Sequence, residues 1–227
     1  MMRFWMGFIA IGCMAMAAGT PDAIAQAESS EEADVTVAAT EEVAVMITTE
    51  GLMVARFFPD VAPGHVENFQ KLSREDFYDG TKFHRVIEGF MIQGGDPNTK
   101  DQPPSTWGTG SPGYTIDAEF NEIQHEPGIL SMARSRNPDS AGSQFFVMHG
   151  KAPSLDGQYT VFGQLVDGMD VLDAIATAPV KPNRMGERSM PVEPVTLKKV
   201  ELMTWEAYQE AKEDLQAQVN EEKEAGE

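Results

Sequence analysis

The sequence predicts a mainly β domain, in which short strands form a closed antiparallel barrel and two separate helices lie against it. Three observations favour this fold class. The apolar runs are short, turn-forming residues are frequent, with 20 Gly and 14 Pro, and only two central stretches have helical periodicity. A chain of 227 residues is long enough for one sizeable domain with flanking segments.

The predicted domain, residues 43–204, opens with a hairpin. Residues 43–47 and 51–57 are apolar runs separated by turn-forming residues, which predicts two paired strands. A helix is expected to begin near Pro63, because the fixed φ of proline suits the first helical turn and apolar side chains then recur at helical spacing.

The rest of the domain alternates short apolar runs with turns. A second helix is expected at residues 169–176, where apolar residues again recur at helical spacing. The other strands are expected at residues 90–92, 128–132, 144–148, 160–166 and 198–203.

The start of the chain has the pattern of a secretory signal peptide, predicted over residues 1–25. Arg3 precedes an uncharged apolar stretch, and two overlapping Ala-x-Ala steps end at Ala25 and Ala27, where cleavage is expected. The stretch is shorter than the ~20 apolar residues that span a bilayer, so we expect no membrane span. The predicted location is therefore periplasmic or secreted.

A lipid-anchored lipoprotein is the minor alternative for the exported form. Cys13 would carry the lipid, but Ala10 stands where a larger aliphatic residue is expected. Cys13 is also the only cysteine of the chain, which excludes an intramolecular disulfide and a cysteine-based metal site.

Most of the net charge of −19 lies in the two flanking segments. Residues 26–42 are expected to be a solvated acidic linker, since residues 28–42 hold six acids and no base. Residues 205–227 hold eight acids against two lysines, with apolar residues at helical spacing. This tail is expected to be a helix laid against the domain, or alternatively a docking helix for a partner. The net charge argues against nucleic acid as a partner, because nucleic acids are polyanions.

Three patterns that resemble functional sites are better explained as structure. Residues 108–113 match G-x-G-x-x-G, but prolines precede and interrupt the motif, which indicates a loop and not a dinucleotide site. The four histidines lack metal-ligand spacing. Ser143 has neither a nucleophile-elbow setting nor an obvious base. No cofactor or metal is expected.

A combination of one cation, two amides and large apolar groups remains. Arg85, Met91 and Gln93 can share a face if their segments pair as strands, and Gln144 and Phe146 share a face by their spacing of two. Core packing explains the Phe and Met residues more readily than a pocket does. Arg85 is harder to dismiss, because a buried guanidinium needs partners.

Six segments in this order resemble the cyclophilin family of peptidyl-prolyl cis–trans isomerases. They are residues 83–87 (FHRVI), 89–96 (GFMIQGGD), 128–133 (GILSMA), 142–146 (GSQFF), 155–157 (LDG) and 161–163 (VFG). The similarity runs from about residue 43 to residue 203. It implies a closed eight-stranded β-barrel capped by two helices, an isomerase activity and proline-containing polypeptides as substrates.

The resemblance also implies roles for individual residues. Arg85 matches the catalytic arginine of the family, and Gln93 is expected to orient it. Ser154 stands where a tryptophan that helps to hold cyclosporin is usual, so weak binding of that drug is expected. The implied substrate-binding residues are Phe90, Met91, Phe146 and Leu155 around the proline ring and Ala133, Arg134, Gln144 and Tyr159 beside it, with Arg134 and Tyr159 resembling bacterial members.

The function expected from the sequence is isomerisation of X-Pro bonds during the folding of exported proteins. A proline-motif binding module or a holdase chaperone is the alternative, because an apolar groove serves either role. The presence of Arg85 beside two glutamines favours the enzyme, since binding alone does not need this cation.

Overall fold

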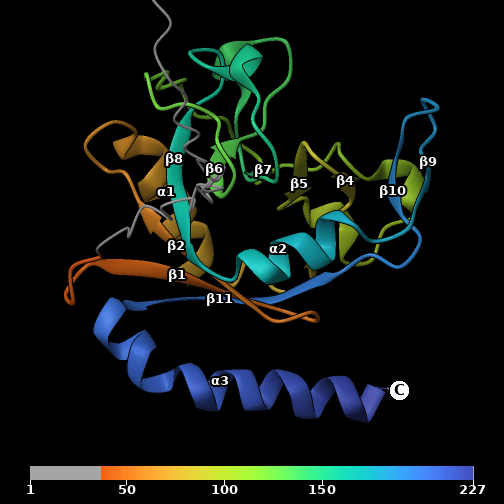
Figure 1. Cartoon of the computed structure of the whole chain (residues 1–227). Coiled ribbons are helices and arrows are strands. Elements are labelled where there is room, and N and C mark those ends of the chain that lie inside the picture. The colour runs from red at the N-terminus through yellow and green to blue at the C-terminus, as the bar shows by residue number, and fades with distance from the viewer. Residues whose placement is uncertain (1–36, 227) are drawn as a thin grey trace, which may run out of the picture. The chain divides into compact units, whose positions relative to one another are not determined.

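A curled antiparallel sheet of nine strands dominates residues 37–226, the part of the chain that the computed structural model describes (Figure 1). The strand order is β3-β11-β1-β2-β8-β6-β7-β5-β4, and β9 and β10 form a separate two-stranded sheet. The predicted signal peptide, the Cys13 alternative and the linker up to residue 36 lie outside the described residues. The strands are β1 (Glu42–Thr48), β2 (Leu52–Phe57), β3 (Thr81–Lys82), β4 (Arg85–Ile87), β5 (Met91–Gly94), β6 (Ile129–Met132), β7 (Phe145–Met148), β8 (Val161–Asp167), β9 (Val180–Pro182), β10 (Arg188–Pro191) and β11 (Thr196–Thr204).

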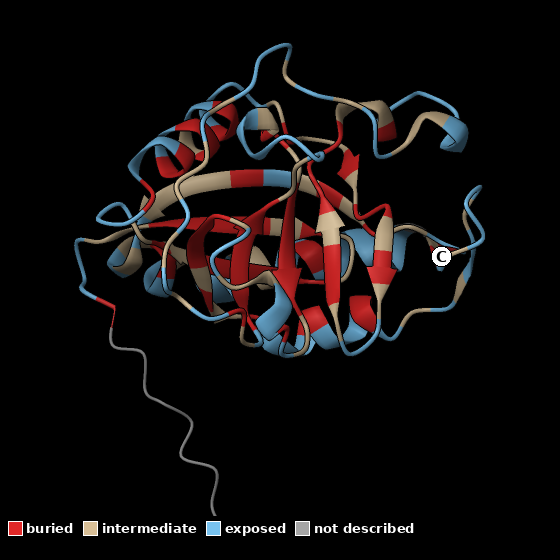
Figure 2. Ribbon diagram, turned by 90° about the horizontal axis from the view of Figure 1, so that it is seen from above, coloured by how far each residue is buried: buried red, intermediate tan, exposed pale blue. Residues whose placement is uncertain are grey.

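Alternation along the strands divides the apolar residues between two faces of the sheet. In β1, Ala44 and Met46 belong to the main core inside the curl, whereas Val43 and Val45 face outward. Figure 2 shows the buried residues concentrated in the strands, with the exposed residues mainly in the surrounding loops.

The ring of Phe69 lies at the centre of the main core. It is fully buried, and its centroid lies within 6 Å of four other aromatic rings, at 4.9, 5.3, 5.4 and 5.9 Å. These partners are Tyr78, Phe145, Phe162 and Phe57, so helix, loop and strand residues meet at one side chain.

Both predicted helices of the domain pack against this core. Helix α1 (Pro63–Arg74) starts at the predicted proline and buries Val66, Phe69 and Leu72. Helix α2 (Met169–Ala176) begins after Gly168, whose φ of +88° and close approach to the carbonyl of Leu52 both require glycine. Four short 3₁₀ turns complete the helical elements: η1 (Pro97–Thr99), η2 (Pro104–Thr106), η3 (Pro138–Ser140) and η4 (Pro153–Leu155).

The first turn of α1 is stabilised by a residue 55 positions away in sequence. One carboxylate oxygen of Glu119 accepts the N–H of Gly64, and the other accepts the N–H of His65, both at 2.9 Å. The Nδ1 atom of His65 lies 2.7 Å from the same carboxylate. Glu119 therefore satisfies N–H groups that the helix itself leaves without partners.

The predicted mainly β fold with two helices packed against a curled antiparallel sheet is confirmed, but the sheet has nine strands instead of eight and its closure is incomplete. Strands β3 and β4 are the two edges of the nine-stranded sheet, and no ladder joins them among the described residues. The chain itself connects the edges: the N–H of Phe83 donates to Val195 and the N–H of His84 donates to Gln93, both at 3.0 Å. The backbone thus pairs with the β11 side of the sheet up to Phe83 and with β5 from His84 onward. Residues 81–87 therefore form two short strands, β3 and β4, instead of one continuous strand.

A third helix, α3 (Trp205–Gly226), lies along the outer side of β1 and β11 (Figure 1). Tyr208 and Val219 are buried against the outward valines and Leu52 of the opening hairpin. The hydroxyl of Tyr208 donates to Asp167 at 2.7 Å, and Lys212 pairs with the same carboxylate. No helix between residues 37 and 226 has the length and apolarity needed to cross a membrane.

Candidate active site

The pairing of three strands places the predicted site residues in a row. Arg85 on β4 is opposite Gln93 on β5, and Gln93 is opposite Phe146 on β7. Met91 lies two residues before Gln93 and therefore shares its face. This confirms that the two segments pair as strands and bring Arg85, Met91 and Gln93 together. The neighbouring residues of these strands point into the main core, so the site lies on the outer face of the sheet.

A pocket of about 150 Å³ opens at this row. It is smaller than the ~300–1,000 Å³ of ordinary small-molecule sites and has room for about one compact side chain. Met91 and Phe146 are almost fully buried beneath it. Its lining comprises nine predicted residues: Arg85, Phe90, Met91, Gln93, Ala133, Arg134, Phe146, Leu155 and Tyr159.

Aromatic and cationic contacts shape the rim of the pocket. The rings of Phe146 and Tyr159 meet edge to face, 5.8 Å apart, and the guanidinium of Arg134 lies 4.5 Å from the centroid of Tyr159. Arg134 also donates to the carbonyl of Gln158 through Nε and Nη2. Its charge is thus already engaged, and it acts as a wall of the pocket.

Arg85 is held by an acidic partner that the sequence analysis missed. Its Nε donates to Oε2 of Glu187 and its Nη2 to Oε1, both at 2.8 Å, in a bidentate ion pair. These hydrogen bonds lower the pKa of Glu187 to about 2, so its carboxylate stays ionised under ordinary conditions. The remaining terminal nitrogen, Nη1, lies 3.9 Å from Sδ of Met91, beside the pocket.

The two glutamines form a chain of amides beside Arg85. Nε2 of Gln93 donates to Oε1 of Gln144 at 3.0 Å, and Nε2 of Gln144 donates to the carbonyl of Gly110 at 2.9 Å. Gln144 lies outside the small pocket and lines an adjoining groove of about 330 Å³ that also includes Gln93, Ala133 and Arg134. The guanidinium of Arg85 donates its hydrogen bonds to Glu187, whereas the amide of Gln93 donates to Gln144. In this structure Glu187, and not the expected Gln93, orients the guanidinium.

A serine, a histidine and an aspartate lie behind Phe146 in an order that resembles a catalytic triad. The ring nitrogens of His125 contact Asp156 at 2.9 Å and Ser131 at 3.1 Å. Ser131 is fully buried, and its hydroxyl donates to the carbonyl of Thr160. Because no substrate can reach this hydroxyl, the group supports the wall of the pocket and is not a nucleophilic site.

Hydrogen bonds from the backbone and then the ring of His125 lower the pKa of Asp156. The ring of His125 also stacks on Phe146, at 6.1 Å between centroids. The histidine therefore fixes Phe146 from behind and connects it to the 153–156 loop.

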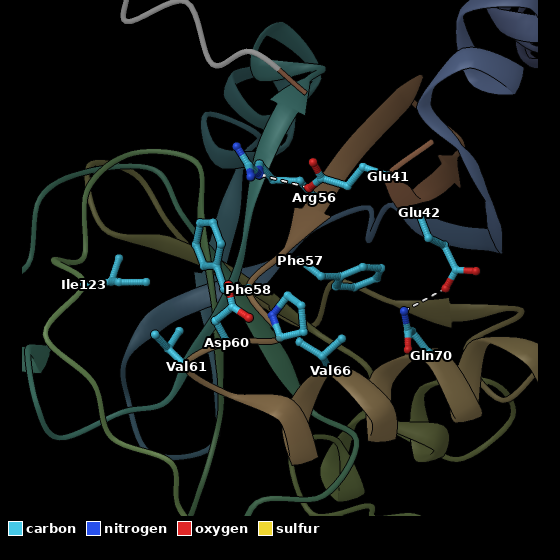
Figure 3. A pocket seen from close by; sticks show the side chains of 11 residues that line it. Glu41, Glu42, Arg56, Phe57, Phe58, Asp60, Val61, Val66, Gln70 and Ile123 are labelled. Atoms are coloured by element: carbon cyan, nitrogen blue, oxygen red, sulfur yellow. Dashed lines mark hydrogen bonds and ion pairs between the residues drawn. The ribbon is translucent and has the colours of Figure 1, made fainter. Parts of the chain in front are cut away.

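A larger pocket, of about 510 Å³, lies at the start of α1 and the end of β2 (Figure 3). Arg56 in this pocket is paired with Glu41, and Glu42 accepts a hydrogen bond from Gln70. The remaining lining is acidic and apolar, so no free cation faces this space within residues 37–226. It shares no residue with the row at Arg85.

Two other patterns considered from the sequence can be placed in the structure. Residues 108–113 form a loop with no preceding strand and no following helix, as predicted, and this loop lines the groove beside Gln144. Within residues 37–226, no group of three or more His, Cys, Asp or Glu side chains is arranged to hold a metal ion.

A family model and individual relatives of this chain point to the same protein family. Residues 43–202 match the family model described as cyclophilin type peptidyl-prolyl cis-trans isomerase. Peptidyl-prolyl cis-trans isomerase B of Bacillus subtilis is 50% identical over 115 residues, which cover 50% of this chain and 75% of that protein. A peptidyl-prolyl cis-trans isomerase of Synechococcus elongatus is 43% identical over 153 residues, covering 67% of this chain and 96% of that protein.

Solved structures agree with this result. A cyclophilin-type isomerase of Cryptosporidium parvum, crystallised in the presence of the dipeptide Ala-Pro, has a TM-score of 0.63 and 32% identity, covering 71% of this chain and 99% of that one. The chain, with its curled sheet and its cation beside a small apolar pocket, belongs to the cyclophilin-type peptidyl-prolyl cis–trans isomerase family.

Proposed function

We propose that this isomerase acts on X-Pro bonds of exported polypeptides, with Arg85 as the catalytic residue. The observation that carries the proposal is the composition of the small pocket. Apolar side chains form one part of its wall, its size suits one proline ring, and the guanidinium of Arg85 lies at its edge. The pocket lining contains no carboxylate, histidine, serine or cysteine. This composition suits a reaction that needs neither a nucleophile nor a general base.

Isomerisation of an imide bond meets this condition, because no covalent bond is broken. The barrier of about 18–20 kcal/mol arises from the partial double-bond character of the C–N bond. When the bond twists, the prolyl nitrogen becomes pyramidal and accepts a hydrogen bond that it cannot accept in either planar state. Arg85 donates to this nitrogen, so its interaction is strongest in the transition state, which lowers the barrier.

The remaining site residues hold the substrate on either side of the rotating bond. Phe90, Met91, Phe146 and Leu155 contain the proline ring, which fixes one side of the imide. Ala133, Gln144 and Gln93 line the adjoining groove, where polar groups suit the peptide backbone before proline. With one side fixed and the other held in a groove, rotation is confined to the C–N bond.

A peptide isomerisation assay tests the assignment of Arg85. We expect Arg85→Ala to lower kcat/KM by about 10²-fold or more, the usual effect of removing one donor to a transition state. Arg74→Ala is the matched control, since Arg74 is an exposed arginine on α1 that pairs with Glu42. Wild-type rates for a folded Arg85→Ala variant would refute the role of Arg85.

Export is supported by the signal-peptide pattern of residues 1–25, with the acidic linker of residues 26–42 as a spacer. Expression of the full chain in a bacterium, followed by fractionation and N-terminal sequencing, tests this proposal. A mature N-terminus after Ala25 or Ala27 in the periplasmic fraction is expected. A membrane-bound form that becomes soluble in Cys13→Ala supports the lipoprotein alternative instead.

The holdase alternative is less well supported by the geometry. The pocket accommodates one ring and is not an extended apolar surface of the kind that retains unfolded chains. Two assays of Arg85→Ala test this alternative. If the chain were chiefly a holdase, the variant would suppress aggregation of a client protein as well as wild type does. It would also support refolding of a proline-limited client at the wild-type rate.

Weak binding of cyclosporin is also proposed. Ser154 is exposed in η4 at the rim, and a hydroxymethyl group offers little apolar surface to the drug. Isothermal titration of wild type and Ser154→Trp tests this, with tighter binding expected for the variant.

A further inference from the structure

The β9–β10 hairpin carries the acid that holds Arg85. This hairpin is separate from the main sheet but packs against β4, the strand of Arg85 (Figure 1). Glu187 lies just before β10, 102 residues after Arg85 in sequence, and makes both hydrogen bonds of the bidentate ion pair. The two contacts use Nε and Nη2, which fixes the plane of the guanidinium and leaves Nη1 on the side of Met91 and the pocket.

Glu187 is itself fixed by its neighbours. Its Oε2 accepts a hydrogen bond from the hydroxyl of Ser189 at 2.7 Å and lies 3.4 Å from Nδ2 of Asn183. Oδ1 of Asn183 accepts the backbone N–H groups of Met185 and Glu187, at 2.9 and 3.1 Å. The turn is thus organised around Asn183, and it presents the carboxylate in one orientation.

We propose that Glu187 is a positioning residue for catalysis, which sets the orientation of the Arg85 guanidinium toward the prolyl nitrogen. This inference rests on the proposed catalytic role of Arg85. An arginine side chain has many rotamers, and with about a third of its surface exposed Arg85 is not held by packing alone. The bidentate pair removes most of these rotamers before the substrate binds.

The position of Glu187 determines what it can and cannot do. Its carboxylate is not among the groups that line the proline pocket, so it does not contact the bound ring. Its effect must therefore pass through Arg85. Loss of Glu187 should leave binding of the proline ring unchanged and lower the fraction of complexes in which Nη1 is correctly aimed.

The test is a comparison of Glu187→Gln with Glu193→Gln. Both substitutions remove one carboxylate charge while keeping the side-chain size, and Glu193 is exposed a few residues further along the chain. We expect Glu187→Gln to lower kcat about tenfold with KM changed less than about twofold, because misaligned groups lose rate and not ground-state binding. Glu187→Asp, which keeps the charge on a shorter arm, should recover part of the loss, and Glu193→Gln should match wild type.

A double-mutant cycle separates positioning from other effects. In the Arg85→Ala background, Glu187→Gln should cause no further loss of kcat, because its target is already absent. An equal tenfold loss in that background would overturn the proposal, as would a normal or raised kcat for Glu187→Gln alone. If instead Arg85→Ala itself had wild-type activity, the proposed function of Arg85 would fail first, and the two failures are therefore distinguishable.

A spectroscopic readout tests the contact without activity. In wild type, the Nε–H group of Arg85 donates to Glu187, so its NMR signal in protein labelled at arginine should be protected from exchange with water. The signal should be lost in Glu187→Ala, which leaves no side-chain acceptor at this position, at a melting temperature within a few degrees of wild type. A protected signal in that variant would show that the guanidinium is held by other groups and would overturn the inference.

Discussion

Removing the side chain of Tyr208 should destabilise the domain without slowing isomerisation. Tyr208 lies in α3 with 1% of its surface exposed, and its ring packs 5.4 Å from that of Trp205. Its hydroxyl donates to Asp167 at 2.7 Å, which connects α3 to the end of β8. The pocket at Arg85 is formed by other strands, β4, β5 and β7.

Two substitutions separate the ring from the hydroxyl. Tyr208→Phe removes one hydrogen bond to a carboxylate that retains Lys212 and the N–H of Gly168, so we expect a loss of about 1–2 kcal/mol, at the lower end for charged partners. Tyr208→Ala also removes a buried ring, and we expect about 3–5 kcal/mol. For a domain of this size these losses correspond to decreases in Tm of about 2–8 °C and 6–20 °C.

Thermal unfolding followed by circular dichroism measures the shifts, with Gln209→Ala as the control on the exposed side of the same helix. Peptide isomerisation is measured well below each Tm. A Tyr208→Ala variant that melts with wild type would show that α3 is not part of the cooperative unit. A fall in kcat at low temperature would show that α3 is coupled to the site.

Two further predictions concern the first helix and the pocket. Glu119→Gln should lower the unfolding free energy by about 1 kcal/mol near neutral pH, because the side chain caps α1. Burial alone would raise the pKa of Glu119, but the hydrogen bonds from Gly64 and His65 outweigh it and lower the pKa. The stabilisation that the Glu119 carboxylate gives the folded state is therefore present above the unfolded-state pKa and is lost as the pH falls through the folded-state pKa. Urea unfolding should show that the difference in unfolding free energy between wild type and variant shrinks in acid. A difference that stays constant with pH would contradict this reasoning. Leu155→Ala should raise KM for an X-Pro peptide by up to about tenfold and change kcat little in steady-state assays. The reason is that it removes half-buried apolar contacts that hold the proline ring equally in the planar and twisted states. A selective loss of kcat would instead indicate a role for Leu155 in the twisting step.

The row of site residues could be predicted because it depends on short-range pairing. Arg85 and Gln93 are separated by one tight turn, so the assumption that their segments pair as strands was enough to bring them together. Gln144, one residue before β7, and Phe146 within it could be placed together from their spacing of two. Physical reasoning alone could not tell whether the Phe and Met residues line a pocket or belong to the core. The resemblance to the cyclophilin family favoured the pocket.

Glu187 could not be predicted in the same way. It lies on a hairpin whose two strands are only three and four residues long and contain proline and charged residues, so alternation gave no signal. A partner for Arg85 was expected on electrostatic grounds, but the chain has 36 acidic residues and nothing local distinguishes this one. The divided strand at Phe83 and His84 was missed for a similar reason, since a change of hydrogen-bond partner has no pattern in sequence.

The order of strands in the sheet has a consequence for how the chain acquires its structure. The first strand, β1, is paired along its length with the last, β11, from Glu42 opposite Thr204 to Thr48 opposite Leu197. Strand β3 has the same late partner. Until the final strand has been synthesised and is available, β1 and β3 both present unpaired backbone groups, so the sheet cannot be completed while the chain is growing. Completion of the nine-stranded sheet therefore waits until β11 has been synthesised, and loss of β11 would leave one side of β1 and the whole of β3 without a strand partner.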